Sequence, residues 1–191
     1  MVKFQVFGPF KIGYDISRRG RGGRPKKIIT AKIGRHFWGA IPKKHLHLAS
    51  HKGCYVFTLS AGRGSMPWYV GKTEKNKRTL KQEVFAEEKL RKYKTILAKS
   101  RRRSPALYFL VRIEQQGPLG SAIDDLETLL IWIASHRNKS VLNKRKRDTQ
   151  PARLMRIVNR IGIKGILNCN PGRPTEPSRL FETLMKFREH N

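Results

Sequence analysis

The clearest pattern of hydrophobic and polar positions lies in the middle of the chain. Residues 53–59 are a run of β-branched and aromatic residues, residues 61–65 are rich in glycine, and residues 68–70 are again aromatic and β-branched. This order predicts a β-hairpin. Residues 106–113 predict the strongest strand of the chain, and because few of its positions are polar, we expect both of its faces to be covered.

Helical periodicity precedes and follows that strand. Residues 79–100 fit two helices bent near Ala86, and residues 121–136 fit one helix with an apolar stripe. Residues 161–167 predict a short strand, and a final helix is expected to begin near Thr175. The pattern therefore predicts a chain that mixes helices with a small sheet.

The first 27 residues differ in character from the rest. Residues 1–16 alternate around a break at Gly8-Pro9 and predict one or two short strands. Residues 17–27 combine cations with glycines and cannot bury a face, so they predict a mobile loop or arm. The alternative for this segment is a solvated linker.

Charge adds the strongest indication of a partner. The chain has 42 Lys and Arg against 13 Asp and Glu, a formal net charge of +29. A surface that basic repels itself unless a polyanion neutralises it, so nucleic acid is the expected partner. An anionic membrane is a weaker alternative, because the sequence has no basic amphipathic helix long enough to lie in an interface, no apolar run of about 18 residues and no signal peptide. A basic ribosomal or architectural protein remains a second alternative.

Two groups of cations are candidates for phosphate contact. They lie in the arm and in a loop after residue 143: Arg18, Arg19, Arg21, Arg24, Lys26, Lys27, Lys144, Arg145, Lys146 and Arg147. We expect both groups to bind the backbone of the nucleic acid, where contacts position a protein without reading sequence. The two cysteines, Cys54 and Cys169, are far apart in apolar surroundings and predict buried thiols in a reducing, cytoplasmic compartment.

One residue stands out on the helix over residues 121–136. Glu127 falls within the apolar stripe formed by residues such as Ile123, Leu126 and Leu130. A carboxylate at such a position must be paired, protonated or bound to a metal ion, because an unpaired buried charge is expensive. The structural alternative is a salt bridge to one of the many arginines.

Several of these features occur in a meaningful order. Gly53-Cys54-Tyr55 is followed by Tyr69-Val70-Gly71, then by a strand, by the helix that carries Glu127, and by Asn143. Over residues 53–143 the chain resembles the GIY-YIG nuclease superfamily. Cys54 and Val70 stand where that family's motifs have isoleucine, and both replacements keep an apolar side chain.

The resemblance implies an α+β fold, with a small three-stranded antiparallel sheet flanked by helices. Around the region of resemblance, we expect a basic N-terminal extension over residues 1–52, a nuclease-like domain over 53–147 and a C-terminal segment over 148–191 that packs on that domain. Gly53, Gly71 and Asn143 would then be structural residues.

The resemblance further implies a metal-dependent endonuclease that hydrolyses DNA. Tyr55 would be the general base or would orient a water, and Tyr69 would supply a second hydroxyl near the scissile phosphate. Glu127 would bind a single Mg²⁺ or Mn²⁺, since oxygen ligands suit these ions. Lys72 would contact the phosphate or lower the pKa of a tyrosine.

The chain departs from the family at the catalytic arginine. Thr79 stands at the expected spacing and Arg78 comes one residue early. Either a shortened loop lets Arg78 take the role, or the site is impaired and the protein binds nucleic acid without cutting it. His45, His47 and His51 suggest a zinc site, but without a nearby cysteine or carboxylate they are better explained as exposed polar residues. The sequence does not indicate the oligomeric state.

Overall fold

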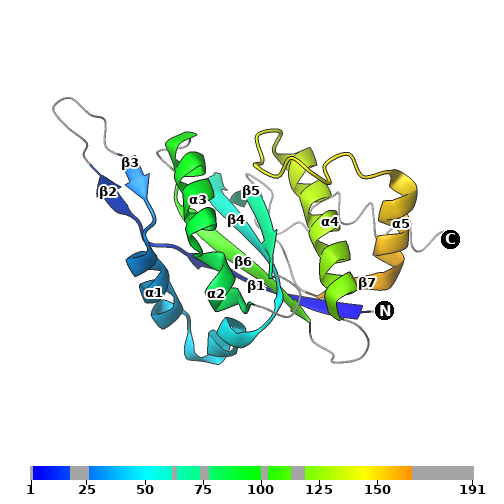
Figure 1. Ribbon diagram of the computed structural model, residues 1–191, viewed down its shortest axis with the longest axis horizontal. Coiled ribbons are helices and arrows are strands. Elements are labelled where there is room, and N and C mark those ends of the chain that lie inside the picture. The colour runs from blue at the N-terminus through cyan, green and yellow to red at the C-terminus, as the bar shows by residue number, and fades with distance from the viewer. Residues whose placement is uncertain are drawn as a thin grey trace.

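The computed structural model describes residues 2–17, 26–61, 64–73, 78–99, 103–112 and 119–164. Within these ranges the strands are β1 (Val2–Lys11), β2 (Asp15–Ser17), β3 (Lys26–Ile28), β4 (Gly53–Ala61), β5 (Gly64–Lys72), β6 (Pro105–Arg112) and β7 (Ile161–Lys164). The helices are α1 (Ala31–Ala40), the 3-10 helix η1 (Lys43–Ser50), α2 (Leu80–Val84), α3 (Glu87–Lys99), α4 (Leu119–Arg137) and α5 (Pro151–Arg160). Figure 1 shows their arrangement.

The protein is α+β, but the expected three-stranded antiparallel sheet was wrong. The main sheet has five strands in the order β5-β4-β6-β1-β7. The antiparallel strands β5, β4 and β6 form one side, and β1 adds to β6 in antiparallel fashion. β7 then pairs with β1 in parallel, which makes the sheet mixed. The resemblance covers residues 53–143 alone, so it could not include strands from either side of that range.

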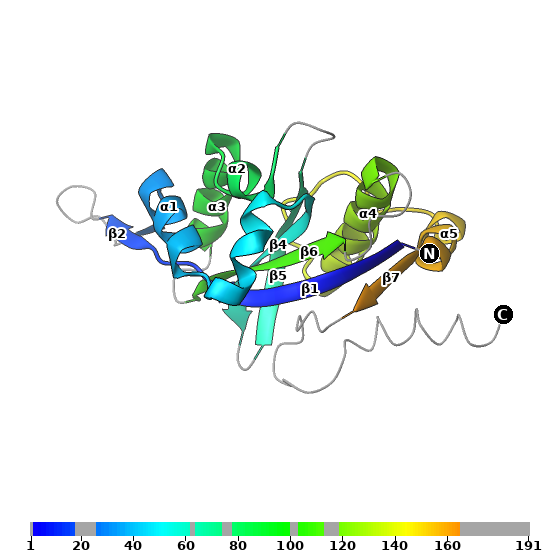
Figure 2. The ribbon, with the colours of Figure 1, turned by 90° about the horizontal axis from the view of Figure 1, so that it is seen from below.

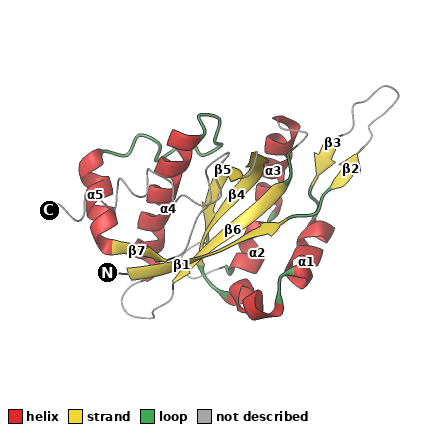
Figure 3. Ribbon diagram, turned by 180° about the vertical axis from the view of Figure 1, so that it is seen from behind, coloured by secondary structure: helices red, strands yellow, loops and turns green. Residues whose placement is uncertain are grey.

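Two hydrophobic clusters pack on opposite faces of this sheet. Along β4, Tyr55 and Phe57 point into the cluster that includes residues of α1, α2 and α3, whereas Cys54 and Val56 point into the cluster formed with α4 and α5. Strand β6 is buried along most of its length, which confirms that both of its faces are covered. Figure 3 shows the sheet between these two groups of helices.

Most of the predicted elements are present. The hairpin β4–β5, the long helix α4 and the pair α2–α3, which is interrupted at Phe85 and Ala86, are confirmed. Where one or two short strands were expected, residues 2–11 form the ten-residue strand β1 and β2 begins at Asp15, with a register shift between Phe7 and Phe10 around the predicted break.

Other parts of the chain differ from the prediction or lie beyond it. Lys26 and Lys27 belong to β3 and pair with β2, so the loop expected over residues 17–27 was wrong at its ends. The helices α1, η1 and α5 were not predicted. Of the strand expected over 161–167, residues 161–164 form β7, and the final helix expected from Thr175 lies outside the described residues.

Strands from distant parts of the sequence lie side by side at one edge of the sheet. Figure 2 shows β7 beside β1, with α5 next to them. The ribbon β2–β3 lies at the opposite end of the molecule. Within the described residues, no helix combines the length and the apolar character that crossing a membrane requires.

Candidate active site

The two tyrosine motifs face each other across the hairpin. Tyr55 on β4 is in register with Gly71 on β5, and Phe57 is in register with Tyr69. A Cβ atom on Gly71 would lie 2.3 Å from Cζ of Tyr55, so the tyrosine ring occupies the space where a side chain of Gly71 would be. The packing of Tyr55 therefore leaves no room for a side chain at Gly71.

Gly53 is required for a different close approach. A Cβ atom there would lie 2.2 Å from the carbonyl oxygen of Leu110 on β6. The amide of Gly53 donates to Oγ1 of Thr73 at 3.1 Å, which ties the start of β4 to the end of β5. The two glycines thus allow strands β5, β4 and β6 to pack closely at one end of the hairpin.

The hydroxyl of Tyr55 is buried without a hydrogen-bond partner among the described residues. Burial raises its pKa well above the ordinary value of 10.0, and the neighbouring Tyr93 and Tyr69 raise it further. The ring of Tyr69 lies 6.2 Å from that of Tyr55, centroid to centroid. At neutral pH Tyr55 is therefore a neutral hydroxyl that can donate or accept a hydrogen bond.

Two lysines of α3 surround Tyr69. The ammonium of Lys92 lies 4.7 Å from the ring centroid and 3.3 Å from the hydroxyl oxygen, and that of Lys89 lies 6.0 Å from the centroid. Partial burial lowers the pKa of Lys92, but its contacts with Glu88 and Tyr69 outweigh this effect and raise it overall. Both lysines are thus charged beside the second tyrosine of the motif.

A buried carboxylate, Glu83 of α2, lies close to this tyrosine group. Its side chain is 4% exposed, and its oxygens lie 3.1 Å from Nζ of Lys89 and 3.4 Å from Nη1 of Arg78. Arg78 precedes the helix, because Thr79 is the N-cap residue and its amide donates to Gln82 at 2.9 Å. Because Arg78 lies before the helix, its early position in the sequence does not rotate it to another face of α2. Its side chain points to Glu83.

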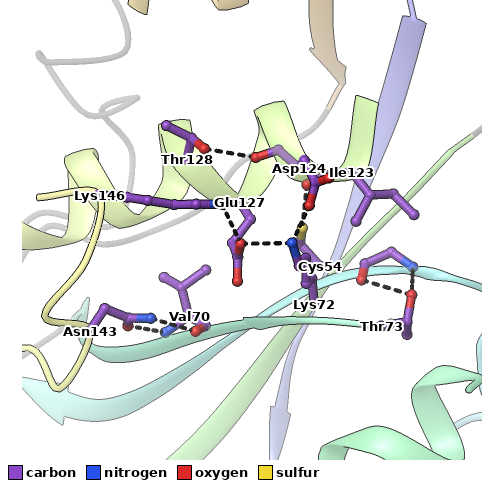
Figure 4. A network of polar contacts seen from close by, with 11 residues as sticks. Cys54, Val70, Lys72, Thr73, Ile123, Asp124, Glu127, Thr128, Asn143 and Lys146 are labelled. Carbon is purple, nitrogen blue, oxygen red and sulfur yellow. Dashed lines mark hydrogen bonds and ion pairs between the residues drawn. The ribbon is translucent and has the colours of Figure 1, made fainter. Parts of the chain in front are cut away.

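Glu127 lies on the other face of the sheet in a network of charges (Figure 4). Its Oε2 lies 2.6 Å from Nζ of Lys146 and 3.2 Å from Nζ of Lys72, and its side chain is 15% exposed. Lys72 also forms an ion pair with Asp124, one turn earlier on α4. Of the alternatives that the sequence left open for Glu127, the structure shows ion pairing, with two lysines in place of the arginine that the salt-bridge alternative named.

The charge of Lys72 is stabilised by this network. Partial burial lowers the pKa of its ammonium, whereas the hydrogen bond to Asp124 and the proximity of Glu127 raise it and prevail. Lys72 contacts these two carboxylates rather than a tyrosine.

Beneath the network, burial raises the pKa of the Cys54 thiol, and its Sγ donates to the carbonyl of Ile123 at 3.5 Å.

Asn143 holds the outer edge of β5. Its Oδ1 accepts from the amide of Val70 and its Nδ2 donates to the carbonyl of Val70, both at 2.8 Å. The amide of Leu142 donates to the carbonyl of Trp68 at 2.9 Å, and Nδ2 of Asn138 donates to that of Pro67 at 2.7 Å. Because β5 is an edge strand, these bonds satisfy backbone groups that would otherwise lack partners.

The structure therefore brings some candidate residues together and separates others. Tyr55 and Tyr69 share the face of the sheet that packs on α2 and α3, whereas Lys72 and Glu127 are paired on the face that packs on α4. Strand β5 joins the two groups, because its side chains alternate between the faces. Sequence reasoning missed Glu83, Lys89, Lys92 and Tyr93 as neighbours of the tyrosines. The spacing of residues 89, 92 and 93 puts them on one side of a helix, but it does not show what that side faces.

The predicted phosphate-binding cations have different surroundings. Lys27 contacts the ring of Tyr14 and donates to the carbonyl of Arg103, and Lys26 is exposed beside it in β3. Lys144 and Arg145 are exposed in the loop after α4. The guanidinium of Arg147 donates to the carbonyls of Asn143 and Val141. The remaining arm residues lie outside the described residues: Arg18, Arg19, Arg21 and Arg24.

The three histidines of the suggested zinc site lie on or next to η1. The rings of His45 and His47 are 6.4 Å apart and those of His47 and His51 are 5.3 Å apart. In the described part of the chain, no three His, Cys, Asp or Glu side chains come together as a set that could hold a metal ion. A magnesium site differs from such a set, because it often uses one or two carboxylates together with water and substrate phosphates.

Comparison with known proteins identifies no relative of this chain. No protein-family model matches the chain, and searches of the curated proteins and of the solved structures find no significant match.

Proposed function

We propose that this protein is a GIY-YIG-type endonuclease, which binds DNA and hydrolyses phosphodiester bonds with the help of a divalent cation. The observation that carries this proposal is the arrangement around β5. The ring of Tyr55 lies over Gly71, the next residue, Lys72, pairs with Glu127, and Asn143 clamps Val70. Residues from four separate parts of the sequence thus meet at one short stretch of an edge strand.

The net charge of +29 supports nucleic acid as the substrate. Near the tyrosines, Lys89 and Lys92 would attract a phosphate to the hydroxyl of Tyr69. Tyr55 would act as a neutral hydroxyl that orients the phosphate or a water, because burial disfavours its phenolate form. A phosphodiester lying at the end of β5, where the side chain of Lys72 is 29% exposed, would be near groups from both faces of the sheet.

Glu127 would hold the divalent cation, with Asp124 as the second carboxylate. These residues fit such an ion, because both supply oxygen donors and the ammonium of Lys72 already lies between them as a cation. A bound Mg²⁺ or Mn²⁺ would supply stabilisation of the negative charge that develops on the phosphate and the leaving oxygen. Lys72 would place a further positive charge beside the same phosphate.

The test is cleavage of supercoiled plasmid DNA at low salt with Mg²⁺ or Mn²⁺, followed on agarose gels. Wild-type protein should nick the plasmid, EDTA should prevent nicking, and Glu127→Gln should slow it by at least about 100-fold, as expected for the loss of a group that stabilises transition-state charge. Asp125→Asn is the matched control, because Asp125 lies on the same helix but pairs with Arg160. Equal nicking by wild type and Glu127→Gln would contradict the proposal.

A second candidate function is nucleic-acid binding without cleavage. The observation that favours it is the pairing of the candidate catalytic groups with other side chains. Glu127 is held by two lysines, and Arg78 points to Glu83. If the protein only binds nucleic acid, it should retard plasmid DNA on the gel without nicking it in Mg²⁺ or Mn²⁺. Branched and specific-sequence substrates should also remain uncut.

A further inference from the structure

The loop between α4 and α5 forms a cavity of about 380 Å³. Among the described residues that line it are the cations Lys144, Lys146, Arg147 and Arg153 and a single carboxylate, Asp148. The excess of positive charge in a small open cavity fits a phosphate group, which lysine and arginine bind by charge-assisted hydrogen bonds.

The backbone of this loop is held in place from within. Arg147 donates to two carbonyls of the preceding segment, and Oγ1 of Thr149 donates to the carbonyl of Lys146 at 2.9 Å. Lys146 has φ = 67°, in the left-handed region that non-glycine residues seldom adopt. The loop therefore fixes the backbone of Lys146, while its side chain, 30% exposed, retains freedom to move.

Lys146 takes part in both the basic cavity and the ion-pair network of Glu127. It lines the basic cavity, and its ammonium lies 2.6 Å from Oε2 of Glu127 (Figure 4). In this arrangement Lys72 and Lys146 balance the two negative charges of Asp124 and Glu127. An added divalent cation would meet a neutral group of four charges, and its binding would be weak.

We infer that the cavity binds a backbone phosphate of the nucleic acid, and that Lys146 is shared between this phosphate and Glu127. When the phosphate enters, Lys146 turns to it and leaves Glu127 paired with Lys72 alone. The carboxylates then carry a net negative charge that favours a divalent cation. This inference rests on the proposed function, and it makes the metal site depend on the presence of nucleic acid.

The test measures binding of a fluorescent 20-base-pair DNA duplex by anisotropy in EDTA, so that no cleavage intervenes. Lys146→Asn removes the ammonium and keeps a residue that tolerates the left-handed conformation. Lys146→Asn and Lys144→Asn should both weaken binding and should each reduce the salt slope by about one. A thermal melt of each variant establishes that it is folded.

The decisive comparison uses Glu127→Gln. This change frees Lys146 for the phosphate, so it should tighten duplex binding by roughly 5-fold more than Asp125→Asn, which removes the same charge from the same helix. This additional tightening by Glu127→Gln, relative to Asp125→Asn, should disappear when Lys146 is already replaced by Asn. It should persist when Lys144 is replaced by Asn. Equal effects of Glu127→Gln in all three backgrounds would overturn the inference.

Two further measurements separate the outcomes. Calorimetric titration of Mn²⁺ into the protein alone should give a roughly 10-fold lower Kd for Lys146→Asn than for wild type, because the competing ammonium is gone. An unchanged Kd would overturn the link to the metal. Titration of inorganic phosphate at constant ionic strength should give the same heat for wild type and Lys146→Asn. Binding of free phosphate with a submillimolar Kd would overturn the assignment of the cavity to a nucleic-acid backbone. Since none of these readouts requires cleavage, failure of the nuclease assay is distinguishable from failure of this inference.

Discussion

Two glutamates on opposite faces of the sheet are each held by two cations, yet their surroundings differ. Glu83 is 4% exposed and pairs with Lys89, which is itself only 12% exposed, and with Arg78. Glu127 is 15% exposed, and its partners Lys72 and Lys146 are 29% and 30% exposed. Arg78 is 51% exposed, so the contrast concerns Lys89, which is held in the packing of α2 and α3, whereas both partners of Glu127 are partly exposed. The difference indicates that the ion pair between Glu83 and Lys89 contributes more to stability than the ion pairs of Glu127.

The largest expected effect tests this contrast directly. Glu83→Gln should lower the free energy of unfolding by about 3 kcal/mol, because it breaks the ion pair at 3.1 Å and leaves the largely buried Lys89 with only the more distant Glu88, at 3.6 Å. Glu127→Gln should cost only about 1 kcal/mol, because both lysines can reach water. Urea denaturation followed by circular dichroism measures both values. Equal losses would remove the distinction between the two carboxylates.

The next effect concerns the face of β5 that carries the tyrosines. Gly71→Ala should destabilise the protein by about 1–3 kcal/mol, because the added methyl group overlaps the ring of Tyr55. Gly39→Ala is the matched control, since a Cβ on Gly39 meets no atom within 4 Å. In a Tyr55→Leu background the cost of Gly71→Ala should shrink, which a double-mutant cycle measures. An unchanged cost there would show that another contact requires Gly71.

The smallest effect is a dependence on alkaline pH. The pKa values of Tyr55 and Tyr93 are raised by burial, so the folded state retains protons that the unfolded chain loses above about pH 10. Their contribution to stability is complete below that pH and declines as the pH rises toward their folded pKa values. Denaturation curves at pH 8 and at pH 10.5 should show a smaller decline for Tyr55→Phe than for wild type. A decline of the same size in both proteins would exclude Tyr55 as a source of it.

The sequence by itself determined the helices and strands of the central region and the unusual position of the Glu127 carboxylate. Period-two and helical patterns located β4, β5, β6, α2, α3 and α4, because these periodicities follow from backbone geometry alone. The position of Glu127 on an apolar stripe left pairing, protonation or a metal ion as alternatives, and the structure shows two lysine partners. The helix α5 was within reach of the same reasoning, since Leu154, Ile157 and Val158 recur at helical spacing after a proline at residue 151.

Only the tertiary structure decided which residues meet. Strand pairing joins residues separated by more than 100 positions, so no local pattern could place β1 between β6 and β7. The same holds for Glu83 beside the tyrosines and for Lys146 on Glu127, because the direction of a loop and the face of a helix are fixed by packing with distant elements. The sequence thus identified groups with the chemistry of a site, and folding decided which of them share one.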